Sequence, residues 1–545
     1  MSFTSLLSTK IVRAASIADA AFDAVVLVGS QESVTQFGAI KQVSAIAPVV
    51  DKFLKLHNGA FHSTSLVQVD SSVVPSGRLI LAGTGHVSRD YDDVRRYQAA
   101  ARKGIELPLG WSQISSLGYS PKFSFPECGA CCCSRSSHTS LYPTQCARGG
   151  KQAEVASTWT LGRKFKLVEL HSIVLKQFLT LPAVFQVGES DTSSQLEKLV
   201  AAYDASFTVC RDVGETGPER MAPPRVAEYV QGAFANGNIK VTVVDDQSVI
   251  LKDFPLMAAV NRAANAVKEH QARLIRLEYV GEGETQDTFF VVGKGVTIDT
   301  GGCDLKTGGH MFGMCRDKYG SAVVGGFFKA IDVLKPKNIK AVGYMCMVRN
   351  SIGSRAYTCD EVITSRSGKR IHIYNTDAEG RLTMLDPLTL AKEEALKAKN
   401  PHLFTVATLT GHEVLSYGYY AAIMDNGPAK ASGWARKVQE VGDEFGQPIE
   451  ISRLHPEDFA FHLAECEQAD LRQGNTKPSV ATLRGHQTPA AFLQMASRID
   501  EHGTDSSHPL KYTHIDMGGC EGDHPSVSFP NPLVTLVAGL VLPHV

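Results

Sequence analysis

The sequence has no uninterrupted run of the roughly 20 apolar residues that a membrane-spanning helix needs. The apolar stretch at residues 532–545 is shorter and predicts a buried helix or strand. An excess of one charge is also lacking, because 55 Lys and Arg stand against 56 Asp and Glu, for a formal net charge of −1. This balance gives no electrostatic reason to expect a nucleic acid or an anionic membrane surface as a partner. We therefore expect neither.

The first 30 residues lack a charged leader followed by a compact apolar block and a cleavage site. They are interpreted as the start of a folded domain. Lys10 and Arg13 precede any acidic residue, which leaves a weak transit peptide as a less favoured alternative.

A complete cysteine metal motif is missing as well. Five of the twelve cysteines lie close together: Cys128, Cys131, Cys132, Cys133 and Cys146. Cys128 and Cys131 stand at the C-x-x-C spacing, but only Cys146 follows where a second pair is needed, and His138 is the one nearby imidazole. This ligand set argues against structural zinc. Seven further cysteines are scattered, which is typical of reduced thiols in an intracellular protein.

The length of 545 residues exceeds what one hydrophobic core usually supports, so we expect two domains, residues 1–190 and 191–545. The first contains predicted strands at 22–29 and 77–85 and a predicted helix at 90–105. Residues 106–190 are atypical, rich in Ser, Cys and Pro with little sustained period. Two interpretations are open: a disordered or poorly packed insertion, or a stretch of translated sequence that differs from the natural one.

Strands alternate with helices from residue 223 onward, which predicts an α/β domain with a mixed or parallel sheet. The predicted helices are residues 223–237, 255–270 and 321–334, and the predicted strands are residues 239–246, 273–281, 288–299 and 339–348. Phosphate-binding glycine patterns are absent, since neither G-x-x-x-x-G-K-[ST] nor a G-x-G-x-x-G that opens a helix occurs. Nucleotide binding is therefore disfavoured.

Charged residues gather on two glycine-punctuated segments, 292–322 and 375–382. Four carboxylates and three cations share these segments: Asp299, Asp317, Asp377, Glu379, Lys294, Lys306 and Arg381. Any one acid alone is more often a solvated surface charge. Carboxylates that lie close together repel, so the set must hold cations or become protonated. Oxygen-rich sites suit Mn²⁺ or Mg²⁺, Zn²⁺ also accepts carboxylates, and two metals can clamp an attacking water and a substrate oxygen.

The motifs VGKGVTIDTGG (292–302) and NTDAEGRL (375–382), in this order and with this separation, are similar to those of the leucine aminopeptidase family of dinuclear metallopeptidases. The resemblance extends from about residue 210 to the C-terminus. It implies a cytoplasmic metalloaminopeptidase, a protease that releases N-terminal amino acids from peptide substrates. It also implies a C-terminal catalytic domain with a central mixed sheet flanked by helices, and a smaller N-terminal macro-like α/β domain.

Carried over by position, the resemblance implies two divalent ions per subunit, Zn²⁺ and/or Mn²⁺, bound by Lys294, Asp299, Asp317, Asp377 and Glu379. Asp299 and Glu379 would bridge the two ions. Lys306 would polarise the substrate carbonyl, and Arg381 would hold a bicarbonate ion as general base. A lysine ligand must bind as the neutral amine, which a neighbouring dication favours.

The same resemblance places four residues on the substrate-binding walls: Met314, Thr408, Leu409 and Gly411. Packing alone is the commoner role for a Met or Thr in such positions. Asp516, at the end of a predicted strand, receives no catalytic role. Assembly into a homo-hexamer is implied by the resemblance only.

Several residues depart from the family pattern. Lys318, Tyr319 and His412 stand where small residues are usual, and Cys520 and Glu521 lie close to where the family has apolar pocket residues. If Glu521 reaches that pocket, its burial would oppose a leucine side chain and favour a basic N-terminal residue. The changes at Lys318, Tyr319 and His412 leave an alternative function open, a catalytically weak family member that acts as a structural or binding oligomer, although no expected metal ligand is lost.

Overall fold

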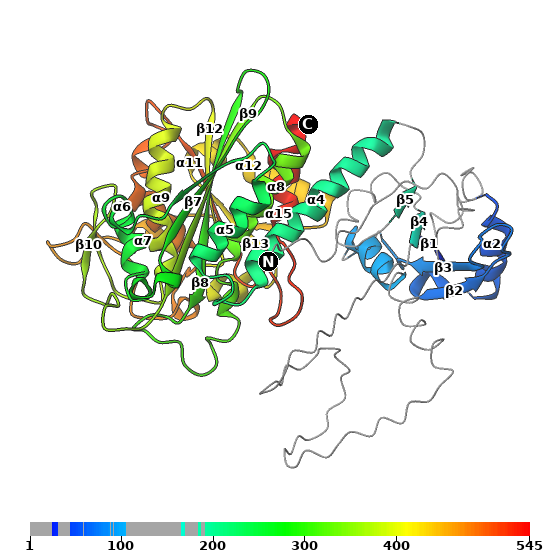
Figure 1. Cartoon of the computed structure of the whole chain (residues 1–545), viewed down its shortest axis with the longest axis horizontal. Helices are drawn as coiled ribbons and strands as arrows, with labels where there is room; N and C mark the ends of the chain where they lie inside the picture. Colours follow the sequence, from blue (N-terminus) through cyan, green and yellow to red (C-terminus); the bar gives the residue numbers. More distant parts are fainter. Residues whose placement is uncertain are drawn as a thin grey trace, which may run out of the picture.

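The computed structural model describes residues 24–30, 44–57, 59–87, 89–90, 92–104, 165–168, 184–186 and 191–545 (Figure 1). The atypical segment 106–190 lies outside the described residues apart from two short strands. The predicted domain boundary at residue 190 stays a prediction.

The N-terminal part contains a five-stranded sheet in the order β2-β3-β1-β4-β5. Its strands are β1 (Ala24–Gly29), β2 (Thr64–Gln68), β3 (Arg78–Gly83), β4 (Phe165–Val168) and β5 (Val184–Gln186). β1 pairs in parallel with β3 and β4, and β2 is antiparallel to β3. Helix α2 (Ala47–Leu56) and the helical residues 95–104 accompany this sheet, so the predicted α/β character of the region is confirmed for its described residues.

The C-terminal part is built on an eight-stranded mixed sheet in the order β14-β13-β16-β12-β8-β9-β7-β6. Its strands are β6 (Lys240–Val244), β7 (Arg273–Val280), β8 (Asp287–Asp299), β9 (Ile339–Asn350), β12 (Pro401–Ala407), β13 (Ala421–Asp425), β14 (Ile449–Ile451) and β16 (Lys511–Asp516). The four central strands β16, β12, β8 and β9 run parallel to one another. Their carboxyl ends therefore lie at one edge of the sheet, where α/β proteins usually bind ligands.

Helices cover both faces of this sheet, as Figure 1 shows. Phe289 and Val291 of β8 pack in one hydrophobic core, whereas Phe290 and Val292 pack in a second core on the opposite face. The first core includes α4 (Asp191–Glu215), α5 (Pro223–Phe234), α8 (Tyr319–Leu334), α12 (Trp434–Phe445) and α15 (Leu533–Leu540). The second includes α6 (Gln247–Asp253), α7 (Pro255–Val260), α9 (Glu379–Ala395) and α14 (Gln487–Ser497). Because both faces are covered, β8 is a nearly continuous apolar run rather than an alternating one.

Shorter elements complete the domain. A small sheet holds β10 (Val362–Thr364), β11 (Arg370–His372) and β15 (Leu471–Arg472), and short helices are α10 (Gly411–Tyr417), α11 (Gly427–Ala431) and α13 (Pro456–Ala460). Residues 532–545, expected to be a buried helix or strand, contain the buried helix α15. No helix among the described residues is long and apolar enough to cross a membrane.

The helix predicted at residues 255–270 was wrong from residue 261 onward. Helix α7 ends at Val260, and two 3-10 turns, Ala264–Ala266 and Lys268–His270, follow it. The buried Asn261 side chain accepts a hydrogen bond from the backbone N–H of Arg349 (2.7 Å) and donates one to the His270 carbonyl (3.1 Å). These bonds fold the chain back against β9, which a regular helix would not permit.

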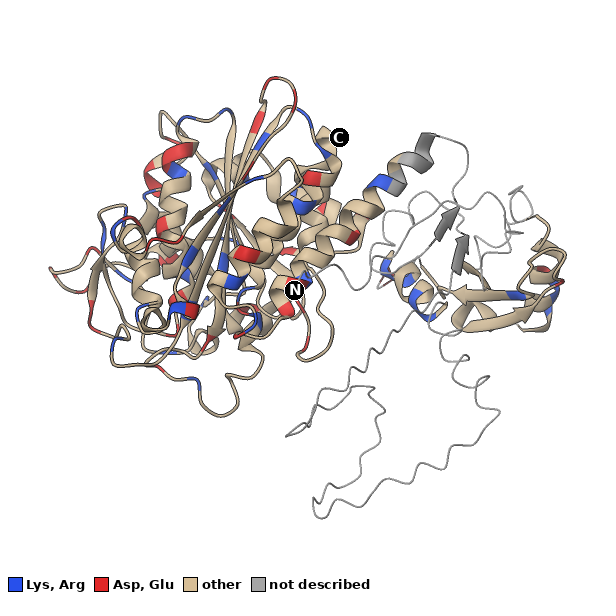
Figure 2. Ribbon diagram, viewed as in Figure 1, with Lys and Arg blue, Asp and Glu red and all other residues tan. Residues whose placement is uncertain are grey.

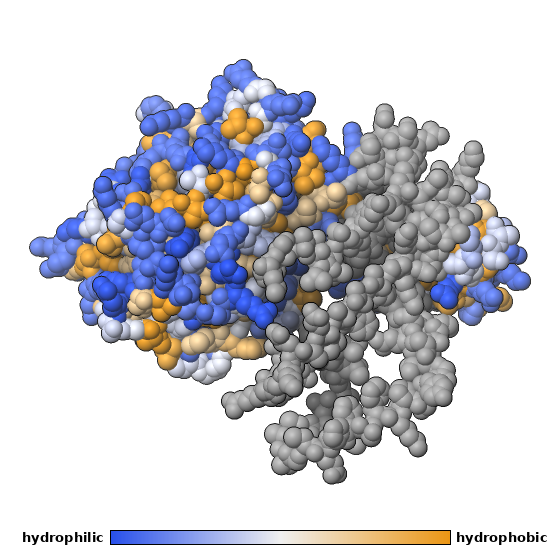
Figure 3. Space-filling model, viewed as in Figure 1, coloured by the Kyte–Doolittle hydropathy of each residue, from blue (hydrophilic) through white to orange (hydrophobic). Residues whose placement is uncertain are grey.

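Charged and apolar residues are mixed over the part of the chain from residue 191 onward. Basic and acidic residues are interspersed along its ribbon (Figure 2), and apolar residues lie among hydrophilic ones on the face drawn in Figure 3. This agrees with the near-zero formal charge of the sequence.

Candidate metal centre

A cavity of about 660 Å³ opens at the carboxyl edge of the central strands. All seven charged residues singled out in the sequence line it, and so do Met314, Thr408, Leu409 and Gly411. The two separate motifs are therefore brought together in space, as the electrostatic interpretation of the sequence requires.

Asp299 is the last residue of β8, and the chain turns sharply after it. Gly301 and Gly302 have positive φ angles of 85° and 63°, which side-chain-bearing residues rarely adopt. The turn lets the Gly301 N–H donate to Asp299 Oδ1 (2.9 Å), and the Asn350 amide donates to the same oxygen (2.8 Å). Asp299 Oδ2 remains directed to the cavity side, where Lys306 Nζ lies 3.0 Å away.

Lys294 reaches the cluster from the middle of β8 and is buried. Its Nζ lies 2.8 Å from Asp317 Oδ1 and 2.8 Å from Glu379 Oε1, and it donates to the Thr408 carbonyl at 3.0 Å. The side chain passes so close to α9 that a Cβ on Gly380 would lie 2.6 Å from its Cδ and Cε. Glycine at 380 is therefore needed for this approach.

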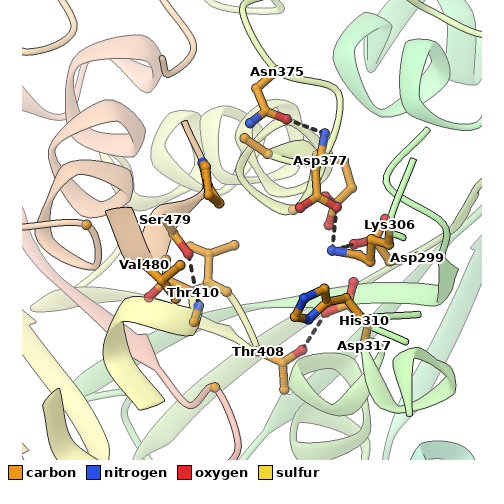
Figure 4. Close-up of a pocket in the computed structure, with 18 of the residues that line it drawn as sticks. Asp299, Lys306, His310, Asp317, Asn375, Asp377, Thr408, Thr410, Ser479 and Val480 are labelled. Carbon is orange, nitrogen blue, oxygen red and sulfur yellow. Dashed lines mark hydrogen bonds and ion pairs between the residues drawn. The ribbon is translucent and has the colours of Figure 1, made fainter. Parts of the chain in front are cut away.

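Asp317 stands directly before the N-cap residue of α8. Thr408 Oγ1 donates to its Oδ1 (3.0 Å, Figure 4), while its buried Oδ2 has no hydrogen-bond partner. The start of α8 is held tightly against the sheet, because a Cβ on Gly320 would lie 2.2 Å from the Val406 carbonyl oxygen. This contact fixes where the carboxylate points.

The motif at 375–382 spans a loop and the start of a helix. Asp377 lies in the loop, where its N–H donates to Asn375 Oδ1 (2.7 Å), and Glu379 and Arg381 belong to the first turn of α9. Lys306 Nζ contacts Asp377 Oδ1, so that this ammonium lies between two carboxylates (Figure 4). The spacing of the motif thus reflects a loop-to-helix junction and not a strand.

Arg381 is buried behind the carboxylates. Its Nη1 donates to the Gln473 carbonyl (3.0 Å), and its Nε has no hydrogen-bond partner among the described residues. Burial lowers the pKa of Arg381 to about 10, although the nearby Glu379 and Asp516 act in the opposite direction. The guanidinium is therefore still charged at neutral pH, with a donor left over for an anion.

Burial and mutual repulsion raise the pKa values of three carboxyl groups in the cluster. Burial raises the pKa of Asp317 and of Glu379, and neighbouring carboxylates raise both further. The pKa of Asp377 rises to about 7 for the same two reasons. Burial alone would lower the pKa of Lys294 and of Lys306, but the surrounding carboxylates raise both overall.

This donor set fits divalent metal ions. Ligand oxygens of Asp299, Asp317 and Glu379 lie within 4.8 Å of one another. Four carboxylates against two lysines leave a formal charge of −2, and one buried oxygen, Asp317 Oδ2, lacks any hydrogen-bond donor. Dications would both neutralise the group and occupy the free lone pairs.

Residues that the sequence did not single out hold this cluster in place. Gln473 accepts from the N–H groups of Tyr374 (3.1 Å) and Asn375 (3.0 Å) and donates to the Ala378 carbonyl (2.9 Å). Asn350 supports Asp299 in the same manner. No local pattern marks either residue, since their partners are distant along the chain.

Asp516, at the end of β16, also holds part of the cavity wall in place by hydrogen bonds. It accepts hydrogen bonds from the Leu409 N–H (3.1 Å), the Thr410 hydroxyl (2.7 Å) and the Gly518 N–H (3.2 Å). The carboxylate thereby holds the loop after β12 beside the cavity.

Tyr319 and Lys318, which depart from the family pattern, are accommodated by their surroundings. Gly214 of α4 leaves room for the Tyr319 ring, because a Cβ there would lie 2.4 Å from Tyr319 Cε2. The Tyr319 hydroxyl lies 2.6 Å from Ser528 Oγ. Lys318 Nζ is buried and donates to the Thr216 carbonyl at 2.9 Å.

The third departure, His412, pairs with another histidine. Its Nδ1 lies 2.8 Å from His486 Nδ1. None of these three departures removes a member of the carboxylate cluster.

Comparison with known proteins agrees with this geometry. Residues 208–531 match the model of the cytosol aminopeptidase family, catalytic domain. The chain is 82% identical, over the whole length of both proteins, to a Caenorhabditis elegans protein named "Putative aminopeptidase W07G4.4". It is 32% identical to a probable cytosol aminopeptidase of Metamycoplasma salivarium, in a match that covers 56% of this chain and 58% of that protein.

Solved structures show the same fold. Leucyl aminopeptidase from Trypanosoma brucei in complex with actinonin superposes with a TM-score of 0.71 at 18% identity, covering 95% of this chain and 92% of that one. The bottromycin maturation enzyme BotP in complex with Mn has a TM-score of 0.66 at 16% identity, covering 95% and 98% of the two chains. The predicted catalytic fold, a central mixed sheet flanked by helices, is confirmed.

Proposed function

Because this chain belongs to the cytosol aminopeptidase family, we propose that it is a dinuclear metalloaminopeptidase that releases N-terminal amino acids from peptides. The observation that carries the proposal is the convergence of four carboxylates and two lysines from separate loops at the carboxyl ends of parallel strands. The cluster of four carboxylates and two lysines has a net negative charge, which a pair of dications would neutralise.

In this proposal two divalent ions, Zn²⁺ and/or Mn²⁺, are held by five residues: Lys294, Asp299, Asp317, Asp377 and Glu379. Asp299 and Glu379 would contribute to holding both ions, and Lys294 would bind as the neutral amine. When bound, the ions would polarise the scissile carbonyl and lower the pKa of a water molecule. Deprotonation of Lys294 becomes favourable only beside a dication, because the carboxylates around it stabilise the ammonium.

Lys306 serves as the oxyanion-stabilising cation. In the structure its ammonium lies between Asp299 and Asp377, which would release it once they bind metal. It lies on a loop that lines the cavity and so can donate to the substrate carbonyl oxygen, where negative charge develops in the transition state.

Arg381 anchors the general base. Its Nη1 is fixed by the Gln473 carbonyl, which leaves the unpartnered Nε for a small anion. We assign bicarbonate to this position, where it would supply a general base. Met314, Thr408, Leu409 and Gly411 form the walls against which the substrate lies.

Two wider features rest on the family alone. The family name supports a cytoplasmic location, and resemblance to family members supports a homo-hexamer. Analytical ultracentrifugation of the purified chain tests the hexamer, since a stable monomer would contradict it.

Metal content followed by turnover tests the proposed function. The chain is stripped with a chelator, reloaded with Mn²⁺ or Zn²⁺, and assayed on a panel of aminoacyl amides. We expect two ions per chain and hydrolysis that disappears on stripping and returns on reloading. Stoichiometric metal without hydrolysis of any amide would favour the structural or binding oligomer instead.

A matched control separates ligation from general loss of charge. Asp360 is an acidic residue whose side chain is 97% exposed. Asp360→Asn should keep both ions and full activity, whereas Asp299→Asn should lose both. If the two variants behave alike, the assignment of the cluster fails.

A further inference from the structure

Glu521 is an acid in the same cavity that the proposed mechanism does not use. Its Oε2 is buried and has no hydrogen-bond partner, and no lysine or arginine among the described residues forms an ion pair with it. Arg316 also lines the cavity, but its Nη1 donates to the Gly522 carbonyl (3.0 Å) and its Nη2 contacts the Ser526 carbonyl. A carboxylate without a counter-ion therefore faces the space that the substrate must enter.

A second acid, Glu413, lies behind the wall of this space. It is 0% exposed, and neither carboxyl oxygen has a hydrogen-bond partner. Gly518 lines the cavity directly in front of it, since a Cβ on Gly518 would lie 3.2 Å from Glu413 Oε2. Because residue 518 has no side chain, no atom beyond the Gly518 backbone separates this carboxyl group from the cavity at that position.

The two acids influence each other through space. Burial raises the pKa of Glu413 to about 11, with Asp516 and Glu521 adding to the effect. Burial raises the pKa of Glu521 to about 7, while Arg316 and Lys294 act in the opposite direction. Lys294, a proposed metal ligand, lines the same cavity as Glu521, and its charge favours the ionised form of that acid.

The position of Glu521 and Glu413 in the cavity determines which part of a bound peptide lies next to them. In an aminopeptidase the free amine and first peptide bond lie at the reacting centre, so the first side chain is the one that adjoins the ligand cluster. An apolar first side chain would leave the oxygens of Glu521 and Glu413 unpaired, which is costly for buried polar groups. A lysine or arginine would bring three or five N–H donors and a positive charge.

We propose that the pocket for the first residue of the substrate selects lysine or arginine, with Glu521 as counter-ion and Glu413 as a deeper acceptor. The proposal rests on the aminopeptidase function proposed above. Val414 and Met314, which line the same cavity, provide an apolar surface for the methylene stem of such a side chain.

Isosteric substrates test the proposal without changing the shape of the ligand. Arginyl and citrullyl amides differ in charge at nearly equal size, and lysyl and norleucyl amides differ by the ammonium group. The fully metal-loaded enzyme should show a kcat/KM at least tenfold higher for the charged member of each pair. A preference for leucyl or norleucyl amides would overturn the proposal and leave the aminopeptidase function standing.

Variants assign the selectivity to the two acids. Glu521→Gln should bring the arginyl-to-citrullyl ratio close to one, whereas Glu413→Gln, which replaces a neutral acid by another hydrogen-bond acceptor, should lower it much less. Asp523→Asn is the control, because Asp523 lies two residues along the same loop, is exposed and accepts from the Tyr419 hydroxyl (3.0 Å). An unchanged ratio in a folded Glu521→Gln protein would refute the assignment.

A binding measurement keeps the pocket testable even where turnover fails. Calorimetric titration of the metal-loaded protein should show tighter binding of free arginine than of citrulline, and the Glu521→Gln change should remove the difference. Hydrolysis of none of the amides contradicts the proposed function, while equal binding of the two amino acids contradicts this pocket.

Discussion

Lys294→Arg should keep the protein folded and positively charged at this position but remove one of its two metal ions. Both side chains are cations that can pair with Asp317 and Glu379, which lie 2.8 Å from Lys294 Nζ in the absence of ions. Only lysine can become a neutral amine at accessible cost, since an arginine guanidinium is not deprotonated in proteins. A ligand that must lose its proton therefore cannot be replaced by arginine.

The cost follows from ordinary side-chain pKa values. Deprotonating a lysine of pKa about 10.4 at pH 7.5 costs about 4 kcal/mol, whereas an arginine, whose ordinary pKa is higher still, costs at least about 7 kcal/mol. The carboxylates around position 294 stabilise either cation, so they raise both costs and leave the difference of about 3 kcal/mol in place. The second ion should accordingly bind at least about 100-fold more weakly to the variant.

Metal per chain, measured by mass spectrometry after dialysis against buffered Zn²⁺ or Mn²⁺, is the assay. We expect two ions for the unaltered chain and one for Lys294→Arg. The aliphatic part of Lys294 packs against Gly380, so the larger arginine side chain could disturb the packing. A Lys294→Met variant, which has a slimmer side chain and no amine, is therefore measured as well and should also bind one ion. Lys340→Arg is the control, since Lys340 is a partly exposed strand lysine whose Nζ lies 3.0 Å from Glu278. Two ions with unchanged affinity in folded Lys294→Arg would refute the role of the neutral amine.

Three further predictions concern other parts of the site. Glu379→Ala should weaken metal binding at least about 100-fold, which is more than the loss of a residue that only supports a ligand would cause. Arg381→Ala should keep both ions and slow turnover about 100-fold. Equal loss of metal in the two variants would contradict these separate roles. Gly320→Ala should destabilise the fold by about 3 kcal/mol in urea unfolding, because its Cβ would meet the Val406 carbonyl at 2.2 Å, and an unchanged midpoint would show that the helix can move away. Burial lowers the pKa of His486 to about 4, so the folded state disfavours its proton and stability is lost as pH falls from 6.5 to 4, by about 3 kcal/mol in all. His486→Gln should lose about 3 kcal/mol less unfolding free energy than the unaltered protein between pH 6.5 and 4. The same pH dependence of the unfolding free energy in both proteins would contradict this prediction.

The central strands could be predicted from sequence because burial on both faces produces a continuous apolar run. The strand predicted at 288–299 is β8, Asp287–Asp299, and the strand predicted at 339–348 is β9, Ile339–Asn350. Helix α8 was predicted to start at residue 321 and starts at Tyr319. The helix predicted through residue 270 was wrong because Asn261 bonds to backbone groups far along the chain, a contact that no local pattern contains.

The charged members of the site could be found by sequence because they belong to two compact motifs. The groups that support them could not. Gln473 lies about 100 residues along the chain from the backbone groups to which it bonds. Gly214 leaves room for the Tyr319 ring, and this role is visible only in the folded structure, where α4 lies beside α8. Glu521 was found as a departure from a family pattern, whereas Glu413 became visible only through its position behind Gly518.

The fold itself reduces the cost of gathering these carboxylates before any ion arrives. Glu379 is the first residue of α9 and Asp317 stands just before α8, so each lies where a helix N-terminus favours negative charge. Close approach through Gly320 and Gly380 lets Lys294 supply an ammonium from the strand below. These contributions still leave the formal charge at −2, and the residual repulsion is what metal binding relieves. The free energy that holds the ions thus comes partly from repulsion stored in the protein, which explains why replacing a single acid or lysine should change metal affinity more than it changes the fold.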